Sequence, residues 1–160
     1  MARPLTLLLA LVAFGTPIGA CGGGDDPPES TPEFDAAYAP INDQILELTA
    51  DSVAGIGEPG APVTGQTAAA AGELADRVEE IGREVSRLEP PEDLADATAA
   101  LEETLADTAE GFDALAEAAE DGDQKAATAA IEQLGPAGQE LNGAQDFLAD
   151  VTGAPTGEEQ

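Results

Sequence analysis

Residues 88–119, LEPPEDLADATAALEETLADTAEGFDALAEAA, contain the two signals that decide the fold. The pair Pro90-Pro91 disfavours helical geometry at Glu89, because the residue before a proline clashes in the helical region. One helix therefore ends near Leu88, and we expect Pro91 to be the first residue of the next helix, a position that suits proline. Beyond this turn, side chains recur at steps of four and three residues, which predicts one buried face of a long helix. They are Leu94, Thr98, Leu101, Leu105, Thr108, Phe112, Leu115 and Ala119.

The same coiled-coil-like spacing predicts three more helices. The first begins after Thr31, an N-cap candidate followed by Pro32, and the second runs from about Gln66 to Leu88. The fourth begins after 121–123, Asp-Gly-Asp, which closes the third helix and caps the next. The predicted core positions are Phe34, Tyr38, Ile41, Ile45 and Leu48; Ala71, Leu74, Val78, Ile81, Val85 and Leu88; and Ala127, Ile131, Leu134, Leu141, Leu148 and Val151.

Two of these helices contain a proline in their interior. A proline there removes one backbone hydrogen bond and clashes with the preceding turn. We expect a kink near residues 36–40, at Pro40, rather than a helix that restarts there. In the last helix we expect an interruption at Gly135-Pro136.

Short connections force neighbouring helices to be antiparallel, so the pattern predicts an all-α, up-down-up-down four-helix bundle. We assign it to residues 32–153. Before it we expect a signal peptide over residues 1–20 and a flexible acidic tether, rich in Gly and Pro, over residues 21–31. After it, residues 154–160 are expected to form a disordered tail.

Residues 1–20 have the pattern of a secretory signal peptide, with Arg3 before an apolar run over residues 5–14. That run is shorter than the about 20 residues that span a bilayer. The next residues, Ile18, Gly19, Ala20 and Cys21, resemble a bacterial lipobox, in which the cysteine is lipidated and becomes the new N-terminus. The alternative is an ordinary signal peptide followed by a chance cysteine.

The lipobox, the tether and the Pro-Pro turn at 88–94 together resemble the small lipoproteins of high-GC Gram-positive, actinobacterial type. The resemblance implies that Cys21 carries a diacylglyceryl group with palmitate among its acyl chains. It also implies a cell-membrane location, lipid-anchored on the extracytoplasmic face. It assigns no catalytic residue.

The chain is strongly acidic, with 33 acidic and 5 basic residues and a net charge of -28. It therefore repels nucleic acid and anionic head groups, which leaves lipid on Cys21 as the membrane attachment. Three of the bases lie on the second predicted helix, at Arg77, Arg83 and Arg87. Either they pair with nearby acids, as in Glu73–Arg77 and Glu79–Arg83, or they form a docking patch for an anionic partner.

Catalysis is not expected from this composition. Histidine is absent and the only thiol is the one expected to be lipidated. Asp121, Asp123 and Glu132 match positions 1, 3 and 12 of a calcium loop, but Lys125 and Ala126 occupy a ligand position and the glycine position. We therefore predict no catalytic residue, no metal site and no cofactor.

Two functions remain. The first is a non-catalytic helical module that binds an envelope protein or peptide. The alternative is a lipoprotein that binds a small ligand or a cation in a cavity between kinked helices, lined by Tyr38, Thr98 and Thr108. Against such a lining, each threonine hydroxyl could instead bond the carbonyl one turn back.

Overall fold

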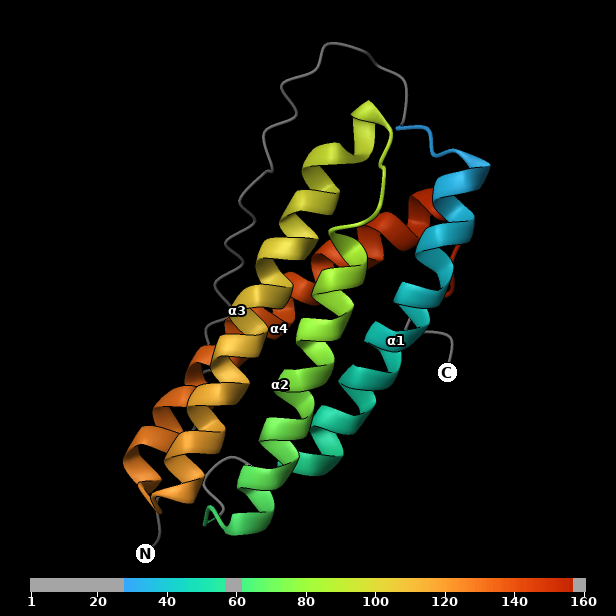
Figure 1. Ribbon diagram of the computed structural model, residues 1–160. Coiled ribbons are helices and arrows are strands. Elements are labelled where there is room, and N and C mark those ends of the chain that lie inside the picture. The colour runs from blue at the N-terminus through green and yellow to red at the C-terminus, as the bar shows by residue number, and fades with distance from the viewer. Residues whose placement is uncertain (1–27, 57–61, 157–160) are drawn as a thin grey trace, which may run out of the picture.

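The protein is an all-α four-helix bundle, as predicted, and the computed structural model describes residues 28–56 and 62–156 of it (Figure 1). The helices are α1, Pro32–Ile56; α2, Gly65–Val85; α3, Ala95–Glu120; and α4, Gln124–Thr152. A short 3-10 helix, η1, Glu92–Leu94, precedes α3. The predicted leader and lipobox, with Ile18, Gly19, Ala20 and Cys21, lie outside the described residues.

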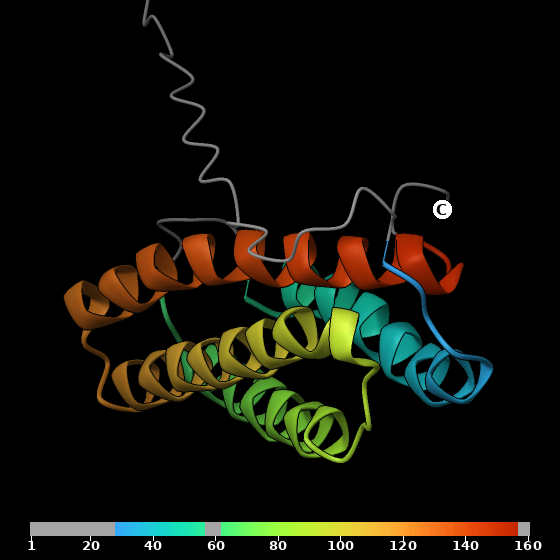
Figure 2. The ribbon, with the colours of Figure 1, turned by 90° about the horizontal axis from the view of Figure 1, so that it is seen from above.

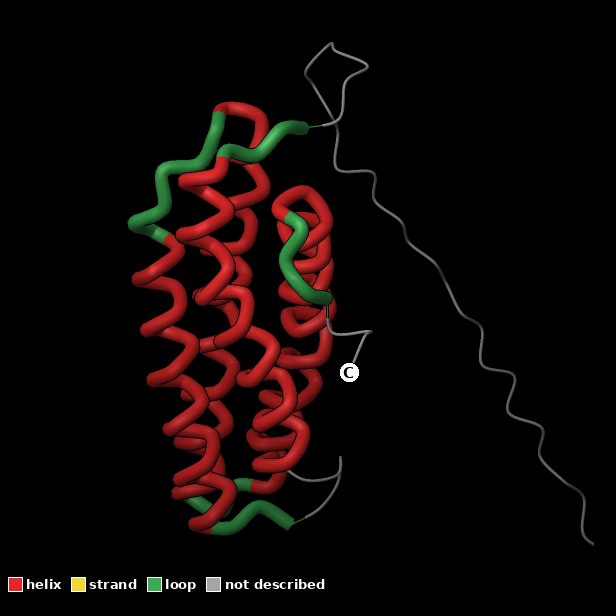
Figure 3. Tube along the Cα trace, turned by 90° about the vertical axis from the view of Figure 1, so that its right-hand side faces the viewer, coloured by secondary structure: helices red, strands yellow, loops and turns green. Residues whose placement is uncertain are grey.

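The helices run alternately up and down, which agrees with the predicted topology (Figure 1). Seen from above, α3 lies between α4 and α2, and α1 occupies the remaining side (Figure 2). Figure 3 shows the described connections gathered at the two ends of the helices. The α2–α3 and α3–α4 interfaces are the most extensive, and the α1–α4 interface is the smallest of the four. The bundle is therefore least tightly closed between α1 and α4.

The predicted core positions form the interior. In the first three helices and η1 every one of them is buried except the half-buried Leu88. In α4, Ala127, Leu141 and Leu148 are buried, whereas Ile131, Leu134 and Val151 are half-buried. Full burial of a Leu, Ile or Phe side chain is worth about 1.5–3 kcal/mol, so packing stabilises helices that would be marginal alone.

The connection between α2 and α3 differs in detail from the prediction. α2 ends at Val85, three residues early, because the amides of Arg87 and Leu88 bond carbonyls three residues back and tighten the chain before the prolines. Pro91 is not the first helical residue: its ψ of 156° is extended, and it precedes η1. Pro91, the second proline of the pair, therefore lies directly before a 3-10 turn, and α3 begins at Ala95.

Asp123 caps α4, as predicted. Its carboxylate accepts hydrogen bonds of 3.0 Å from the amides of Lys125 and Ala126. Gly122 before it has a φ of 67°, a left-handed conformation that glycine adopts without strain. The acidic turn that resembles part of a calcium loop is thus a helix cap.

Both interior prolines lie within continuous helices. α1 passes through Pro40 without restarting. α4 also passes through Gly135-Pro136, so the expected interruption there is wrong. Both prolines are on the exposed side of their helices, where water can hydrate the carbonyl that each leaves without a helical partner.

The C-terminal end of α4 is held against the bundle. Gly153 adopts a left-handed φ of 70°, and the amide of Ala154 bonds the carbonyl of Ala149 at 3.0 Å. Ala154 packs against the core, and the carbonyl of Pro155 accepts a bond of 2.9 Å from Asn42. The tail expected from residue 154 is therefore docked over its first residues.

Candidate functional site

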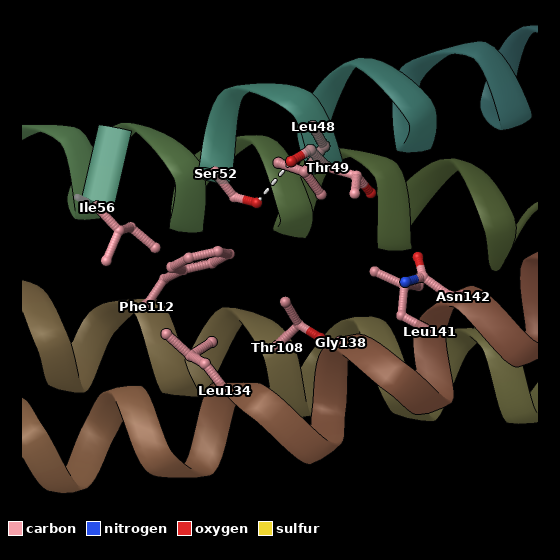
Figure 4. Close-up of a pocket in the computed structure, with 10 residues that line it drawn as sticks. All are labelled: Leu48, Thr49, Ser52, Ile56, Thr108, Phe112, Leu134, Gly138, Leu141 and Asn142. Carbon is pink, nitrogen blue, oxygen red and sulfur yellow. Dashed lines mark hydrogen bonds between the residues drawn. The ribbon is translucent and has the colours of Figure 1, made fainter. Parts of the chain in front are cut away.

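A cavity of about 130 Å³ lies between α1 on one side and α3 and α4 on the other (Figure 4). Its apolar lining comes from all three helices, and its polar lining is confined to hydroxyls and one amide. The apolar side chains are Leu48, Ile56, Phe112, Leu134 and Leu141. The polar side chains are Thr49, Ser52, Thr108 and Asn142.

Two glycines shape this cavity. A Cβ added at Gly111 would lie 2.6 Å from Cδ2 of Leu134, so α3 and α4 approach closely at the buried Gly111. One turn after Leu134, Gly138 lines the cavity, and a Cβ there would meet no atom within 4 Å. α4 thus lies close to α3 at Gly111, and one turn after Leu134 it lines the cavity at a position that has no side chain.

The hydroxyl groups of the lining donate hydrogen bonds to backbone carbonyls of their own helices. Thr49 Oγ1 donates to the Ile45 carbonyl at 3.0 Å, and Ser52 Oγ donates to the Thr49 carbonyl at 2.8 Å. Their lone pairs remain able to accept a hydrogen bond. No charged side chain lines the cavity, so it suits neutral chemistry.

Of the three residues expected to line a cavity, Thr108 does so and the other two lie elsewhere. Thr98 donates to the Leu94 carbonyl at 2.9 Å, and Thr108 donates to the Thr104 carbonyl at 2.8 Å. Each threonine thus bonds one turn back within its helix. Tyr38 is buried between α1 and α4, where its hydroxyl donates to the Gln145 carbonyl at 3.4 Å.

A buried amide pair joins α1 to α4 beside Tyr38. Gln145 Nε2 donates to Asn42 Oδ1 at 2.9 Å, and both side chains are almost fully buried. Asn42 Nδ2 donates in turn to the Pro155 carbonyl. Burial raises the pKa of the Tyr38 hydroxyl, and the nearby Asp146 carboxylate adds to the rise. The amide pair, Tyr38 and Pro155 together fasten α1 to the C-terminal half of α4, beginning one turn beyond the cavity-lining Leu141.

The sequence did contain a signal for this amide pair. Asn42 follows Tyr38 by four residues and precedes Ile45 by three, and Gln145 stands in the same relation to Leu141 and Leu148. Gln145 therefore completes the four-three rhythm of its helix, whereas Asn42 lies beside Ile41 and widens a stripe that is already complete. A polar residue in such a position predicts a buried hydrogen bond.

The two arginines of α2, Arg77 and Arg83, differ in the ion pairs that they form. Arg77 pairs across the helices with Asp51 of α1 at 2.5 Å and Glu47 at 3.8 Å, rather than with Glu73 on its own helix. Within residues 28–56 and 62–156, every ion pair belongs to Arg77. The pair expected between Glu79 and Arg83 is therefore not formed. Exposed ion pairs of this kind contribute little, at most about 1 kcal/mol.

Comparison of the chain with family models, with curated proteins and with solved structures gave no match. Within the described part of the chain, no three His, Cys, Asp or Glu side chains are grouped so as to hold a metal ion. No helix in that same part has the length and apolar character needed to cross a membrane. The cavity between α1, α3 and α4 is a candidate ligand site within the described residues.

Proposed function

We propose that this protein is an extracytoplasmic lipoprotein, anchored to the cell membrane through lipid on Cys21, that acts as a non-catalytic helical module binding an envelope protein or peptide. The proposal joins the lipobox-like residues 18–21 to the acidic bundle. A chain with a net charge of -28 has no electrostatic attraction to anionic lipid, so it needs a covalent anchor.

The observation that carries the proposal is where the chain enters the bundle. Ser30, just before α1, donates to the Val151 carbonyl near the end of α4 at 3.4 Å. The α2–α3 connection lies at this same end, and the α3–α4 connection lies at the opposite end (Figure 1). α3 has 26 residues, which gives the bundle a length of about 39 Å.

An anchor at Cys21 would therefore hold one end of the bundle near the membrane and direct the other end outward. Residues 22–27 span at most about 20 Å when fully extended. Val53, near the outward end of α1, is 77% exposed and is the most exposed large apolar side chain of the described residues. We assign partner binding to this outward end.

The test is site-specific photo-crosslinking in intact cells. A photo-reactive residue replaces Val53 at the outward end, or Glu89 at the anchored end as a matched control. We expect a discrete adduct from position 53, none of comparable yield from position 89, and loss or weakening of the adduct when Cys21→Ser is added. If only background adducts form, or if both positions give equal yields of adduct, the proposal that a partner binds at the outward end is refuted.

The anchor has its own test. Mass spectrometry of the mature N-terminus should find a lipidated residue 21. A start at unmodified Ala20 or Gly22 would contradict the localisation while leaving the crosslinking result to be judged separately.

Small-ligand binding is a second candidate function, and the cavity between α1, α3 and α4 favours it. The cavity lies along the side of the bundle, so occupancy there is compatible with an anchored end and an outward end. This cavity does not support cation binding, the other form of this alternative, since its lining carries no carboxylate.

A further inference from the structure

We infer that the cavity between α1, α3 and α4 binds one small, neutral alcohol whose apolar body is about the size of a benzene ring. The inference rests on the second function proposed above, small-ligand binding, and specifies its ligand. The apolar body would lie against Phe112, Leu134 and Leu141, and the hydroxyl would lie toward Ser52 on α1 (Figure 4).

The size of the ligand follows from the volume. The cavity measures about 130 Å³. An enclosed apolar cavity of roughly 150 Å³, lined by Leu, Ile and Phe, binds benzene, and the space here has a similar volume although it is partly open to solvent. The lining here has the same composition on its apolar side. A single ring or a branched chain of similar bulk fits, and a long acyl chain does not.

The charge of the ligand follows from the lining. No ionisable side chain contacts the cavity, so neither an anion nor a cation would find a partner after losing its water. An anion is repelled further by the net charge of -28. The acidic exterior attracts cations to the surface but not into this uncharged space. A neutral molecule is therefore preferred.

The hydroxyl follows from the hydrogen bonds of the polar lining. Ser52 and Thr49 already donate to carbonyls of α1, so the ligand meets acceptor lone pairs there. The exposed carboxamide of Asn142 stands on α4 across the cavity (Figure 4). A ligand hydroxyl can donate a hydrogen bond to one of these acceptors, whereas a hydrocarbon makes no hydrogen bond at this edge.

Gly138 and Gly143 provide a matched pair of variants. Both glycines are on α4, and an added Cβ at either would meet no atom within 4 Å. Only Gly138 lines the cavity. Gly138→Leu should fill the cavity, and Gly143→Leu should place the same side chain outside it. Gly138→Ala is a smaller step that fills part of the space and keeps the test informative if the leucine variant does not fold.

The experiment is an NMR titration of the purified full chain with three probes of nearly equal size: benzyl alcohol, benzoate and benzylammonium. We expect saturable one-to-one binding of benzyl alcohol, with shifts at Ile, Leu and Phe resonances, and at least tenfold weaker binding of both ions. Gly138→Leu should weaken benzyl alcohol at least tenfold, Gly138→Ala by less, and Gly143→Leu within twofold of the parent.

Equal binding by the two leucine variants would overturn the site. Benzylammonium or benzoate binding as tightly as benzyl alcohol, with Gly138→Leu still blocking it, would overturn the ligand class but preserve small-ligand binding. Absence of saturable binding by all three probes would overturn both. None of these results bears on the anchor or on the outward-end adduct, which are tested in cells.

Discussion

Replacing Asn42 with leucine should destabilise the bundle by about 2–4 kcal/mol. The change removes two hydrogen bonds of 2.9 Å, one to the Pro155 carbonyl and one from Gln145 Nε2. Each is worth a net of about 0.5–1.5 kcal/mol, and leaving a buried donor unpaired costs about 1–3 kcal/mol. Gln145 is only 2% exposed, so water cannot replace its lost partner there. Pro155 is exposed, and its carbonyl can be hydrated.

The decisive measurement is a double-mutant cycle. Gln145→Met alone leaves Asn42 Oδ1 without its donor and should cost about 1–3 kcal/mol. In the double variant neither amide remains, so the loss should be smaller than the sum of the single losses by about 1–3 kcal/mol. Urea unfolding followed by circular dichroism gives all four free energies of unfolding. Gln139→Met, at an exposed position of α4, is the control and should stay within about 0.5 kcal/mol of the parent.

Additivity of the two single losses, to within about 0.5 kcal/mol, would refute the reasoning, because it would mean that the two amides do not interact in the folded chain. A changed urea dependence in either single variant would also count against it. Such a change would indicate an altered unfolded or native state rather than a lost hydrogen bond.

Three further predictions concern the same end of the bundle and the whole surface. Tyr38 is the only tyrosine, and its folded-state pKa is raised above 10.0. The native state therefore keeps this proton while the unfolded state loses it, so the free energy of unfolding should be unaffected by Tyr38 below pH 10 and should fall above it. Tyrosinate absorbance should appear at higher pH in the native chain than in denaturant, and a Tyr38→Phe variant should lack this part of the alkaline loss; coincident titrations would contradict the burial. Truncation after Gly153 should cost about 1–2 kcal/mol in urea unfolding, because it removes the Pro155 acceptor of Asn42, whereas truncation after Thr156 should be neutral; equal effects would contradict the docked tail. Raising salt from low to moderate concentration should raise Tm by screening repulsion within a chain of net charge -28, and an unchanged Tm would count against that repulsion.

The sequence determined the features that depend on neighbouring residues. The four-three spacing located all four helices and the large buried apolar side chains of the described residues, since a helix repeats every 3.6 residues whatever it packs against, but it missed several buried alanines. The cap at Asp123 and the turn before α3 follow from the local chemistry of Asp and Pro. The errors arose in the segment from Val85 to Pro91 and at Pro136, where a helix can shorten, start as a 3-10 turn or pass through a hydrated proline.

Only the tertiary structure decided which residues meet. Asn42 and Gln145 are 103 residues apart, and their pairing depends on how α1 and α4 are rotated and aligned along their axes. The same alignment pairs Arg77 with Asp51 rather than with Glu73 four residues away. The packing of whole helix faces determines these pairings, because its energy exceeds that of any single surface ion pair.

The candidate cavity also has features that the sequence predicts and features that only the tertiary structure determines. Thr98 and Thr108 were both expected to line a cavity, and both bond the carbonyl one turn back, but only Thr108 lines it. Around the cavity, α3 approaches α4 closely at Gly111 and Leu134, and Gly138 lines the space without a side chain. The sequence by itself determined a four-helix bundle with amphipathic faces. The tertiary structure alone decided where those faces fail to meet, because a void depends on the distances between helices and not on the order of residues along any one of them.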